Sequence, residues 1–375
     1  MRQQVAGCIL TPAGWRRGVL FFGDRITAIE GDTALAPQPD DGLVLPGFID
    51  LHIHGGGGAD AMDGGDAIVA ITRLHARHGT TSLLATTMSA SHEAIEQALA
   101  SIGPVVGQRP RGAARVLGVH LEGPFISPDR LGAQPNAARL GALSELASLR
   151  GLAPIRVLTL APELTGHLDF IRDLRRVGIL PQIGHSNGRY EEGVAALAAG
   201  AKGFTHLFNA MSELHHRQPG IVGAALAHAE YAEIIPDLLH VHPGAIQVAR
   251  RAIPKLFCVT DATAGAGMPD GTYRLGSQTV SKCPNGVRLA DGTLAGSVLT
   301  MDQALRNLVA IGIPLDEAAR RISTYPADYL SEWDRGRLQP GAYADIVVLS
   351  PDLELMQIFI EGEAIAPLGR VHTAN

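Results

Sequence analysis

The sequence predicts an α/β protein, a (β/α)8 barrel of the TIM type with a small β-sandwich built from both ends of the chain. Two patterns carry this prediction. Apolar runs alternate with amphipathic segments through the middle of the chain, and strand-like hairpins occupy both ends. A length of 375 residues, with 46% hydrophobic and 18% charged residues, suits one large domain and an accessory part.

The accessory part is predicted to combine residues 1–46 with residues 336–375. Each of these regions contains two apolar runs separated by a short polar turn, which is the pattern of a β-hairpin. We therefore expect the two ends of the chain to pair into one small β-sandwich. The runs are residues 19–22 and 25–30, and residues 344–349 and 355–360.

Residues 47–335 contain eight apolar runs that we expect to form the strands of the barrel. Amphipathic segments such as residues 67–78 and 191–199 separate these runs. Eight β/α alternations favour a closed parallel barrel, and a doubly wound open sheet is the alternative. The runs are residues 48–53, 81–86, 116–121, 155–160, 179–184, 203–208, 232–237 and 256–260.

The composition argues against several classes of partner. A net charge of −6 and a pI of about 6.2 indicate no general affinity for nucleic acid. We find no run of about eighteen apolar residues that could cross a membrane, and no signal-peptide pattern. Because Cys8, Cys258 and Cys283 lack the spacing of a disulfide framework, we expect a protein of the reducing cytoplasm.

Two histidines end the first predicted barrel strand. Side chains alternate along a strand, so Asp50, His52 and His54 share one face and the apolar residues between them share the other. Imidazoles at i and i+2 can chelate one cation, but two hydrogen-bonded surface histidines would have the same spacing. The pair alone is therefore weak evidence for a metal.

Four further polar residues lie at the ends of later strands, namely Glu122, His185, His206 and Asp261. In a parallel barrel the carboxyl ends of all strands converge on one face, where active sites lie. Each residue has a plain structural alternative, such as a salt-bridged glutamate at a strand end. Because these four strands, like the first one, end in residues that can bind a metal, the six residues together predict a metal centre.

The ligand types indicate a catalytic centre, because histidine and carboxylate ligands with an open position are typical of metal hydrolases. A cation held there lowers the pKa of water towards 7 and polarises a carbonyl group. We expect Asp261 to be the catalytic residue, accepting a proton from the water and passing it to the leaving nitrogen. One or two divalent ions are expected, with zinc favoured and iron, manganese or cobalt as alternatives.

Other motifs are better explained as ordinary structure than as binding or catalytic sites. The glycines of residues 55–58 lack a GxxxxGK pattern, and those of residues 265–267 lack a GxGxxG frame, so ordinary loops are favoured over nucleotide sites. Ser186 has no GxSxG elbow around it, which argues against a serine hydrolase.

Longer strings around the predicted ligands resemble the amidohydrolase superfamily and, within it, the N-acetylglucosamine-6-phosphate deacetylases, over nearly the whole chain. The strings HLEGPF at residues 120–125 and THLFNAM at residues 205–211 are specific to these deacetylases. The HxH pair is shared across the superfamily. Further matching segments are residues 45–50, 184–186, 215–220, 260–262 and 294–297.

The resemblance implies hydrolysis of the acetamide of an N-acetylhexosamine 6-phosphate, an amino-sugar phosphate, to acetate and the free amine. It implies that Glu122, His185 and His206 hold the main metal, and that Glu122 bridges to a second one. Because the chain keeps His52 and His54, a site with two metals is expected.

The resemblance also implies contacts to the substrate. Arg217 matches an arginine that reaches the phosphate from a neighbouring subunit, so a homodimer or a homotetramer is implied. The matching positions are Ala133, Gln134, Asn209, Ala210, Arg217, His240, Leu294, Ala295 and Gly296.

One of these positions departs from the family pattern. The family usually has Lys-Gly-Ala-His where this chain has Leu131-Gly132-Ala133-Gln134, so a glutamine replaces a histidine that contacts the substrate. Glutamine can donate and accept hydrogen bonds but cannot carry charge. N-acetylgalactosamine 6-phosphate or a sugar without phosphate therefore stays an alternative substrate.

Two alternatives share the predicted fold. Enzymes resembling dihydroorotase bridge two metals through a carboxylated lysine after the fourth strand, whereas the lysines here are Lys202, Lys255 and Lys282, none of them at that place. A non-catalytic scaffold on this fold would have lost metal ligands, and this chain keeps all six.

Overall fold

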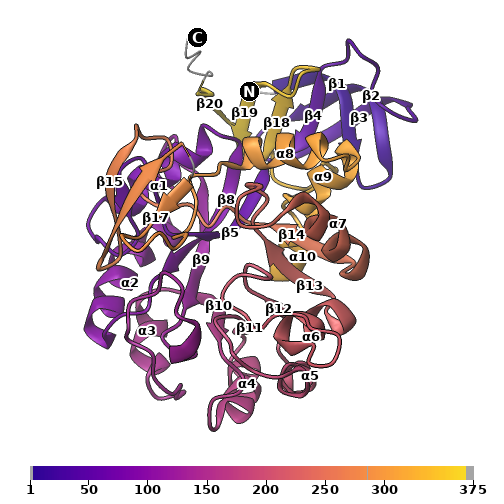
Figure 1. Ribbon diagram of the computed structural model, residues 1–375. Helices are drawn as coiled ribbons and strands as arrows, with labels where there is room; N and C mark the ends of the chain where they lie inside the picture. The colour runs from indigo at the N-terminus through magenta and orange to yellow at the C-terminus, as the bar shows by residue number, and fades with distance from the viewer. Residues whose placement is uncertain (1–2, 285, 369–375) are drawn as a thin grey trace.

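The centre of the molecule is a curled parallel sheet of six strands, in the order β12-β11-β10-β9-β8-β5 (Figure 1). The computed structural model describes residues 3–284 and 286–368. Each of the six runs predicted here contains a strand, although β12 covers only the first two residues of its run. The strands are β5 (Phe48–Ile53), β8 (Thr80–Thr87), β9 (Arg115–Glu122), β10 (Ile155–Leu160), β11 (Leu180–Ile183) and β12 (Gly203–Phe204).

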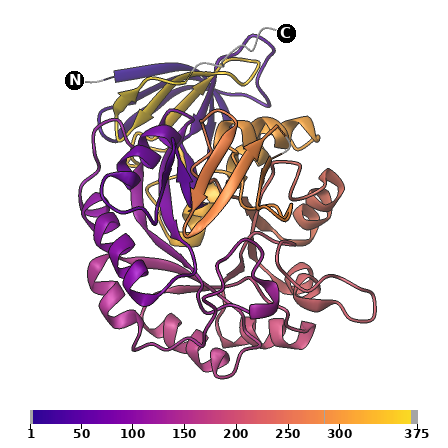
Figure 2. The ribbon, with the colours of Figure 1, turned by 60° about the vertical axis from the view of Figure 1, so that its left-hand side comes forward.

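The remaining two predicted strands, β13 (Tyr231–Ile234) and β14 (Lys255–Cys258), form a separate parallel pair. Backbone hydrogen bonds join this pair to the six-stranded sheet on both sides. Leu207 N donates to Glu233 O at 2.8 Å on one side, and Asp261 N donates to His52 O at 2.9 Å on the other. Helices lie outside the curled sheet (Figure 2).

Amphipathic helices connect the strands and cover them from outside, as their buried faces indicate. In α4 the buried residues are His167, Phe170, Ile171 and Leu174, which recur at helical spacing. In the described part of the chain, no helix has the length and hydropathy that crossing a membrane requires. The helices are α1 (Ala67–Ala76), α2 (His92–Gly107), α3 (Leu146–Leu152), α4 (His167–Arg176), α5 (Tyr190–Ala199), α6 (Gly220–His228), α7 (Pro243–Ala252), α8 (Met301–Ala310), α9 (Leu315–Arg321) and α10 (Thr324–Leu330).

The two ends of the chain pair in one seven-stranded sheet that curls onto itself, since the ring centroids of Phe22 in β2 and Phe359 in β19 lie 4.9 Å apart although three strands separate β2 from β19 in the sheet. Its order is β20-β19-β18-β4-β1-β2-β3. Strand β4 pairs with β1 on one edge and with β18 on the other, so that hydrogen bonding continues through a single sheet. The strands are β1 (Gln3–Thr11), β2 (Gly14–Phe22), β3 (Ile26–Thr33), β4 (Leu43–Pro46), β18 (Ile346–Leu349), β19 (Leu355–Ile360) and β20 (Glu363–Ile365).

Both faces of this terminal sheet are apolar in its central strands. Leu45 and Val347 belong to the main core that continues into the barrel. Val44 and Ile346 point the other way, into a smaller core with Leu338. Because side chains alternate along each strand, one sheet can serve two cores, and the seven strands sit beside the barrel as a separate body (Figure 1).

A three-stranded antiparallel sheet, which the sequence analysis did not predict, lies between β14 and α8. Its strands are β15 (Gly271–Leu275), β16 (Gln278–Cys283) and β17 (Gly286–Arg288). We call it the flap, because its residue Leu275 lines the pocket described below. The flap has its own small apolar core with Met88, and Gly276 N donates to buried Asp60 Oδ2 at 3.0 Å. Asp60 ends the short hairpin of β6 (Gly55–Gly56) and β7 (Ala59–Asp60).

Candidate metal centre and active site

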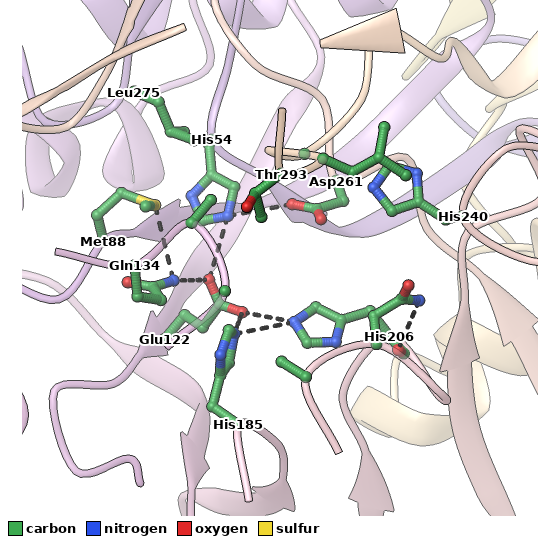
Figure 3. A pocket seen from close by; sticks show the side chains of 16 residues that line it. His54, Met88, Glu122, Gln134, His185, His206, His240, Asp261, Leu275 and Thr293 are labelled. Atoms are coloured by element: carbon green, nitrogen blue, oxygen red, sulfur yellow. Dashed lines mark hydrogen bonds and ion pairs between the residues drawn. The ribbon is translucent and has the colours of Figure 1, made fainter. Parts of the chain in front are cut away.

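The six predicted metal ligands converge at one place, although they come from five different strand ends. All six side chains are buried, and Figure 3 shows them around the pocket, apart from His52. Glu122 ends β9, and the others lie one to three residues beyond a strand, except for His52 inside β5. The alternation of side chains and the common direction of parallel strands thus place them together.

Glu122 lies at the centre of this group, and its oxygen Oε1 faces two histidines. His185 Nε2 is 3.1 Å and His206 Nε2 is 3.0 Å from Glu122 Oε1. The two imidazole nitrogens are 3.1 Å from each other. These three donor atoms form one of the groups in the described residues that could hold a metal ion.

The other oxygen of Glu122 faces a second pair of histidines. Glu122 Oε2 is 3.2 Å from His54 Nε2 and 3.5 Å from His52 Nε2. Asp261 Oδ1 approaches the same nitrogens from the opposite side, at 3.2 Å from His54 and 3.5 Å from His52. One carboxylate therefore lies between two sets of nitrogen donors, which is the arrangement of a bridging ligand.

The hydrogen bonds of the ring nitrogens support the interpretation as a metal site. His185 Nδ1 is 2.9 Å from Arg130 O, and His52 Nδ1 is 3.0 Å from Glu233 Oε2. Because a carbonyl and a carboxylate only accept, both Nδ1 atoms carry a proton, which leaves Nε2 of each ring as the nitrogen that faces Glu122 and could bind a cation. The donor set of imidazole nitrogens and carboxylate oxygens fits zinc and similar divalent ions.

The pKa shifts describe the same excess of negative charge. Burial would lower the pKa of His54, but Asp261 and Glu122 outweigh it and raise that pKa to about 9. Burial would raise the pKa of Asp261, yet His52 and His54 hold it at about 2. Glu122 likewise has a pKa well below its ordinary value, because the surrounding histidines outweigh its burial. Both carboxylates are therefore ionised, and the site favours positive charge.

Three of the converging residues have an unusual backbone. The φ angles of His185, His206 and Asp261 are 48°, 31° and 51°. These angles are left-handed, a conformation that L residues other than glycine adopt at a cost of roughly 1–2 kcal/mol each. Each residue follows a strand, so the left-handed step turns the chain out of the strand beside the Glu122 side chain. Such strain is typical of functional sites.

Glu233 is a functional candidate that the sequence analysis missed. It lies inside β13 in an apolar run, is fully buried, and accepts from His52 Nδ1. A carboxylate in this position fixes the tautomer and orientation of a ligand histidine. A charged residue in an otherwise buried strand was the signal that could have identified it.

His120 faces the same interior but is already fully hydrogen-bonded. Its Nδ1 is 3.0 Å from Leu51 O and its Nε2 is 2.7 Å from Thr159 Oγ1. Burial, together with the charge of His52, lowers the pKa of His120 to about 4, so the ring is neutral. This histidine supports the strands around the site.

A pocket of about 250 Å³ opens beside Glu122. Its volume is close to the lower end of small-molecule sites, about 300 Å³, and suits a compact ligand. Seven of the nine predicted substrate positions line it: Ala133, Gln134, Asn209, Ala210, His240, Leu294 and Gly296. The pocket is also lined by four residues that the sequence did not predict: Met88, Gly132, Leu275 and Thr293.

Two predicted substrate positions lie outside this pocket. Arg217 is exposed and lines a different hollow. Ala295 is fully buried in the core of the flap. Its neighbour Gly296 has a φ of +58°, and a Cβ at this glycine would lie 2.8 Å from Asp261 O, so a side chain there would displace Asp261.

His240 lines the pocket with an imidazole that is hydrogen-bonded to a carboxylate. Its Nδ1 is 2.7 Å from Asp237 Oδ2. Burial opposes protonation, but the Asp237 carboxylate outweighs it and raises the pKa of His240. The protonated form of this imidazole, which the raised pKa favours, would attract an anionic ligand.

Residues 43–365 match the model of the Amidohydrolase family. An N-acetylgalactosamine-6-phosphate deacetylase of Escherichia coli O157:H7 is 38% identical over 365 residues, which cover 95% of this chain and 97% of that protein. An N-acetylglucosamine-6-phosphate deacetylase of Bacillus subtilis (strain 168) is 39% identical over 338 residues, which cover 86% of this chain and 85% of that protein.

Solved structures agree with these relatives. The N-acetylglucosamine-6-phosphate deacetylase of Thermotoga maritima has a TM-score of 0.89 at 33% identity, with 96% of this chain and 99% of that chain covered. A mutant of the Mycobacterium smegmatis enzyme, in complex with N-acetyl-D-glucosamine-6-phosphate, has a TM-score of 0.88 at 34% identity, with coverages of 97% and 98%. The chain therefore belongs to the amidohydrolase family and, within it, to the group that contains these N-acetylhexosamine-6-phosphate deacetylases.

Proposed function

We propose that the protein is a metal-dependent hydrolase that removes the acetyl group of N-acetyl-D-glucosamine 6-phosphate and releases D-glucosamine 6-phosphate and acetate. The observation that carries this proposal is the Glu122 carboxylate between two histidine pairs at the floor of the pocket. The relatives of known activity add the substrate class, since they are named for this deacetylation.

Each side chain has a task in this reaction. Glu122, His185 and His206 would hold one divalent cation, and His52 and His54 a second one that shares Glu122. When bound, such a cation polarises the acetyl carbonyl and lowers the pKa of water. Asp261, ionised at neutral pH, accepts the proton of the attacking water at a carboxylate oxygen and then gives it to the amide nitrogen as the C–N bond breaks.

The rest of the pocket would bind the sugar phosphate. Asn209, Ala210, Ala133 and Leu294 line its wall beside the reacting group. The raised pKa of His240 supports binding of an anionic substrate. We infer that Arg217, exposed on the loop before α6, completes the phosphate site of a neighbouring subunit in a homodimer or homotetramer.

N-acetylgalactosamine 6-phosphate is the second candidate substrate. It is favoured by the relative from Escherichia coli O157:H7, which is 38% identical and covers 95% of this chain. Gln134, where the family usually has histidine, keeps the choice of epimer open.

An acetate-release assay on four sugars tests both candidates: N-acetylglucosamine and N-acetylgalactosamine, each with and without 6-phosphate. We expect turnover of a 6-phosphate sugar, its loss after chelation, and its recovery when zinc, iron, manganese or cobalt is returned. A rate that exhaustive chelation leaves unchanged would contradict the metal-dependent reaction.

We further infer that the eight strands make a closed (β/α)8 barrel over residues 47–335, with the terminal sheet as a second domain. The hydrogen bonds that join β13 and β14 to both edges of the six-stranded sheet support this. The three free cysteines, Cys8, Cys258 and Cys283, support a reducing compartment such as the cytoplasm.

A further inference from the structure

Gln134 lies against the metal ligands rather than at the mouth of the pocket. Its side chain is buried, and its amide Nε2 donates to Glu122 Oε2 at 2.5 Å (Figure 3). The resemblance alone places this residue among the substrate contacts. In the structure its shortest contact is to the carboxylate that both histidine pairs face.

The orientation of the Gln134 amide follows from its second partner. Ser89 N donates to Gln134 Oε1 at 2.7 Å. A backbone N–H can only donate, so the carbonyl end of the amide must face Ser89 and the –NH2 end must face Glu122. The amide therefore connects the segment after β8 to the carboxylate at the end of β9.

This contact selects one of the two oxygens of Glu122. Oε1 faces His185 and His206, whereas Oε2 faces His54, His52 and the Gln134 amide. Rotation of the carboxylate about its last bond would take both oxygens out of these positions at once. A donor that holds Oε2 prevents that rotation, and a neutral donor leaves the negative charge available to a cation.

We propose that Gln134 is a positioning residue of the metal centre, which holds Glu122 Oε2 in place so that the His52/His54 pair binds a second divalent cation. The inference rests on the proposed function, because it needs a metal centre. Its effect falls on one of the two sites, since Oε1 already has two histidines near it and makes no contact with the amide.

The experiment compares zinc binding by the metal-depleted full chain and by variants at this position. Zinc is titrated by calorimetry, and bound zinc is measured by elemental analysis after dialysis. Gln134→Leu keeps the size of the side chain and removes the donor. We expect two zinc ions on the unmodified chain, and on the variant a second site that is weaker by about 10–100-fold, the usual effect of losing a partner of a metal ligand. The first site should change by less than about threefold.

Two further variants make the result specific. In Gln134→His a neutral imidazole offers one N–H and one acceptor, so the second site should recover at pH 8. Gln278→Leu removes a half-buried glutamine whose amide lies 3.5 Å from Ala133 O, close to the same loop but away from the carboxylate, and should leave zinc binding unchanged. If Gln134→Leu does not fold, as judged by thermal melting, Gln134→Asn keeps the amide but is too short to reach, and should show the same selective weakening.

The outcomes separate this inference from the proposed function. A folded Gln134 variant with two unchanged sites, or with both sites weakened alike, overturns the inference, as does an unmodified chain that takes up only one zinc at saturation. A selective loss of the second site supports it. A chain that binds two zinc ions but releases no acetate from the four sugars contradicts the proposed function and leaves the inference standing.

Discussion

At the scale of single residues, the site depends on carboxylates whose charge the surrounding protein does not fully neutralise. Glu122 and Asp261 are buried and ionised, and both raise the pKa values of His52 and His54 beside them. A divalent cation would bring two positive charges to this site at once, whereas protons would have to bind to several separate groups to supply the same charge. The arrangement of charge thus explains why the site favours a metal ion. It also indicates which substitutions would separate metal binding from substrate turnover.

Replacing Asp261 by asparagine should separate the two. Asp261→Asn removes the proton acceptor but leaves Glu122 and the four histidines in place, so we expect kcat to fall by about 10²–10⁴-fold while bound metal stays close to that of the unmodified chain. Acetate release and elemental analysis on the same sample measure both. Asp291→Asn, at an exposed position, is the control. Full activity of Asp261→Asn would show that another group moves the proton.

Glu233 should affect metal affinity more than chemistry. Glu233→Gln removes the charge beside His52 Nδ1, which is 3.0 Å from the carboxylate, so the ligand ring becomes less basic and less firmly oriented. We expect zinc affinity at the second site to fall by roughly 10-fold, measured by titration with a competing chelator. Glu30→Gln on the exposed edge of the terminal sheet serves for comparison. Equal zinc affinities in the two variants would show that Glu233 does not support the second site.

At the scale of elements, the strands were predictable and the flap was not. The barrel strands are apolar runs that end in a polar residue, and that pattern marks both their position and their active end. In β15 and β16 only Leu275 and Val280 are buried and the other positions are exposed or half-buried, so these strands lack the apolar run that marks the barrel strands. Glu233 was not predicted either, because a single carboxylate in an apolar run looks like the polar residue that ends a strand.

Asp60 is a buried anchor of the flap. Asp60 accepts from Gly276 N at 3.0 Å and from Met62 N at 2.8 Å, so it ties the flap to the β6–β7 hairpin. Asp60→Ala leaves both donors without partners, and we expect a loss of about 1–3 kcal/mol of stability and a several-fold rise in KM with unchanged metal content. Urea unfolding and steady-state kinetics measure these effects. Asp270→Ala, exposed at the start of the flap, should alter neither.

At the scale of the whole molecule, a cluster of arginines joins the terminal sheet to the barrel. Glu361, after β19, accepts from Arg115 Nε at 2.8 Å and from Arg335 Nη2 at 2.5 Å. Arg109 Nε lies 3.2 Å from the same carboxylate. Arg115 begins β9, and Arg109 and Arg335 also lie within residues 47–335, so one acidic side chain of the terminal sheet holds three cations of the barrel. Sequence patterns could not predict this contact, because they contain no information on which charges meet between segments so far apart in the chain.

The Glu361 cluster should make stability depend on acid. Burial would raise the pKa of Glu361, but Arg115 and Arg335 lower it from 4.5 to about 2. As the pH falls, Glu361 therefore takes up its proton at a lower pH in the folded state than in the unfolded state. The stabilisation is complete above about pH 4.5 and is lost as the pH falls towards 2. In Glu361→Gln this part of the pH dependence, of the order of 1 kcal/mol after solvent screening, should disappear.

Urea unfolding at pH 7 and pH 3 measures the Glu361 effect. The difference in stability between the unmodified chain and Glu361→Gln should shrink from pH 7 to pH 3. The exposed Glu191→Gln should differ little from the unmodified chain at either pH. A difference that stays constant between the two values would show that Glu361 acts by packing rather than by charge.

The terminal sheet also determines when folding can finish. Val44 in β4 pairs with Val348 in β18, so β4 cannot complete its pairing until about three hundred more residues have been synthesised. Until β18 arrives, β4 exposes the unpaired edge and apolar side chains that favour association between nascent chains. The barrel between them can collapse first, since each of its strands neighbours the next along the chain. Ribosome stalling just before residue 346 should therefore yield a molecule with an assembled site and an aggregation-prone flank.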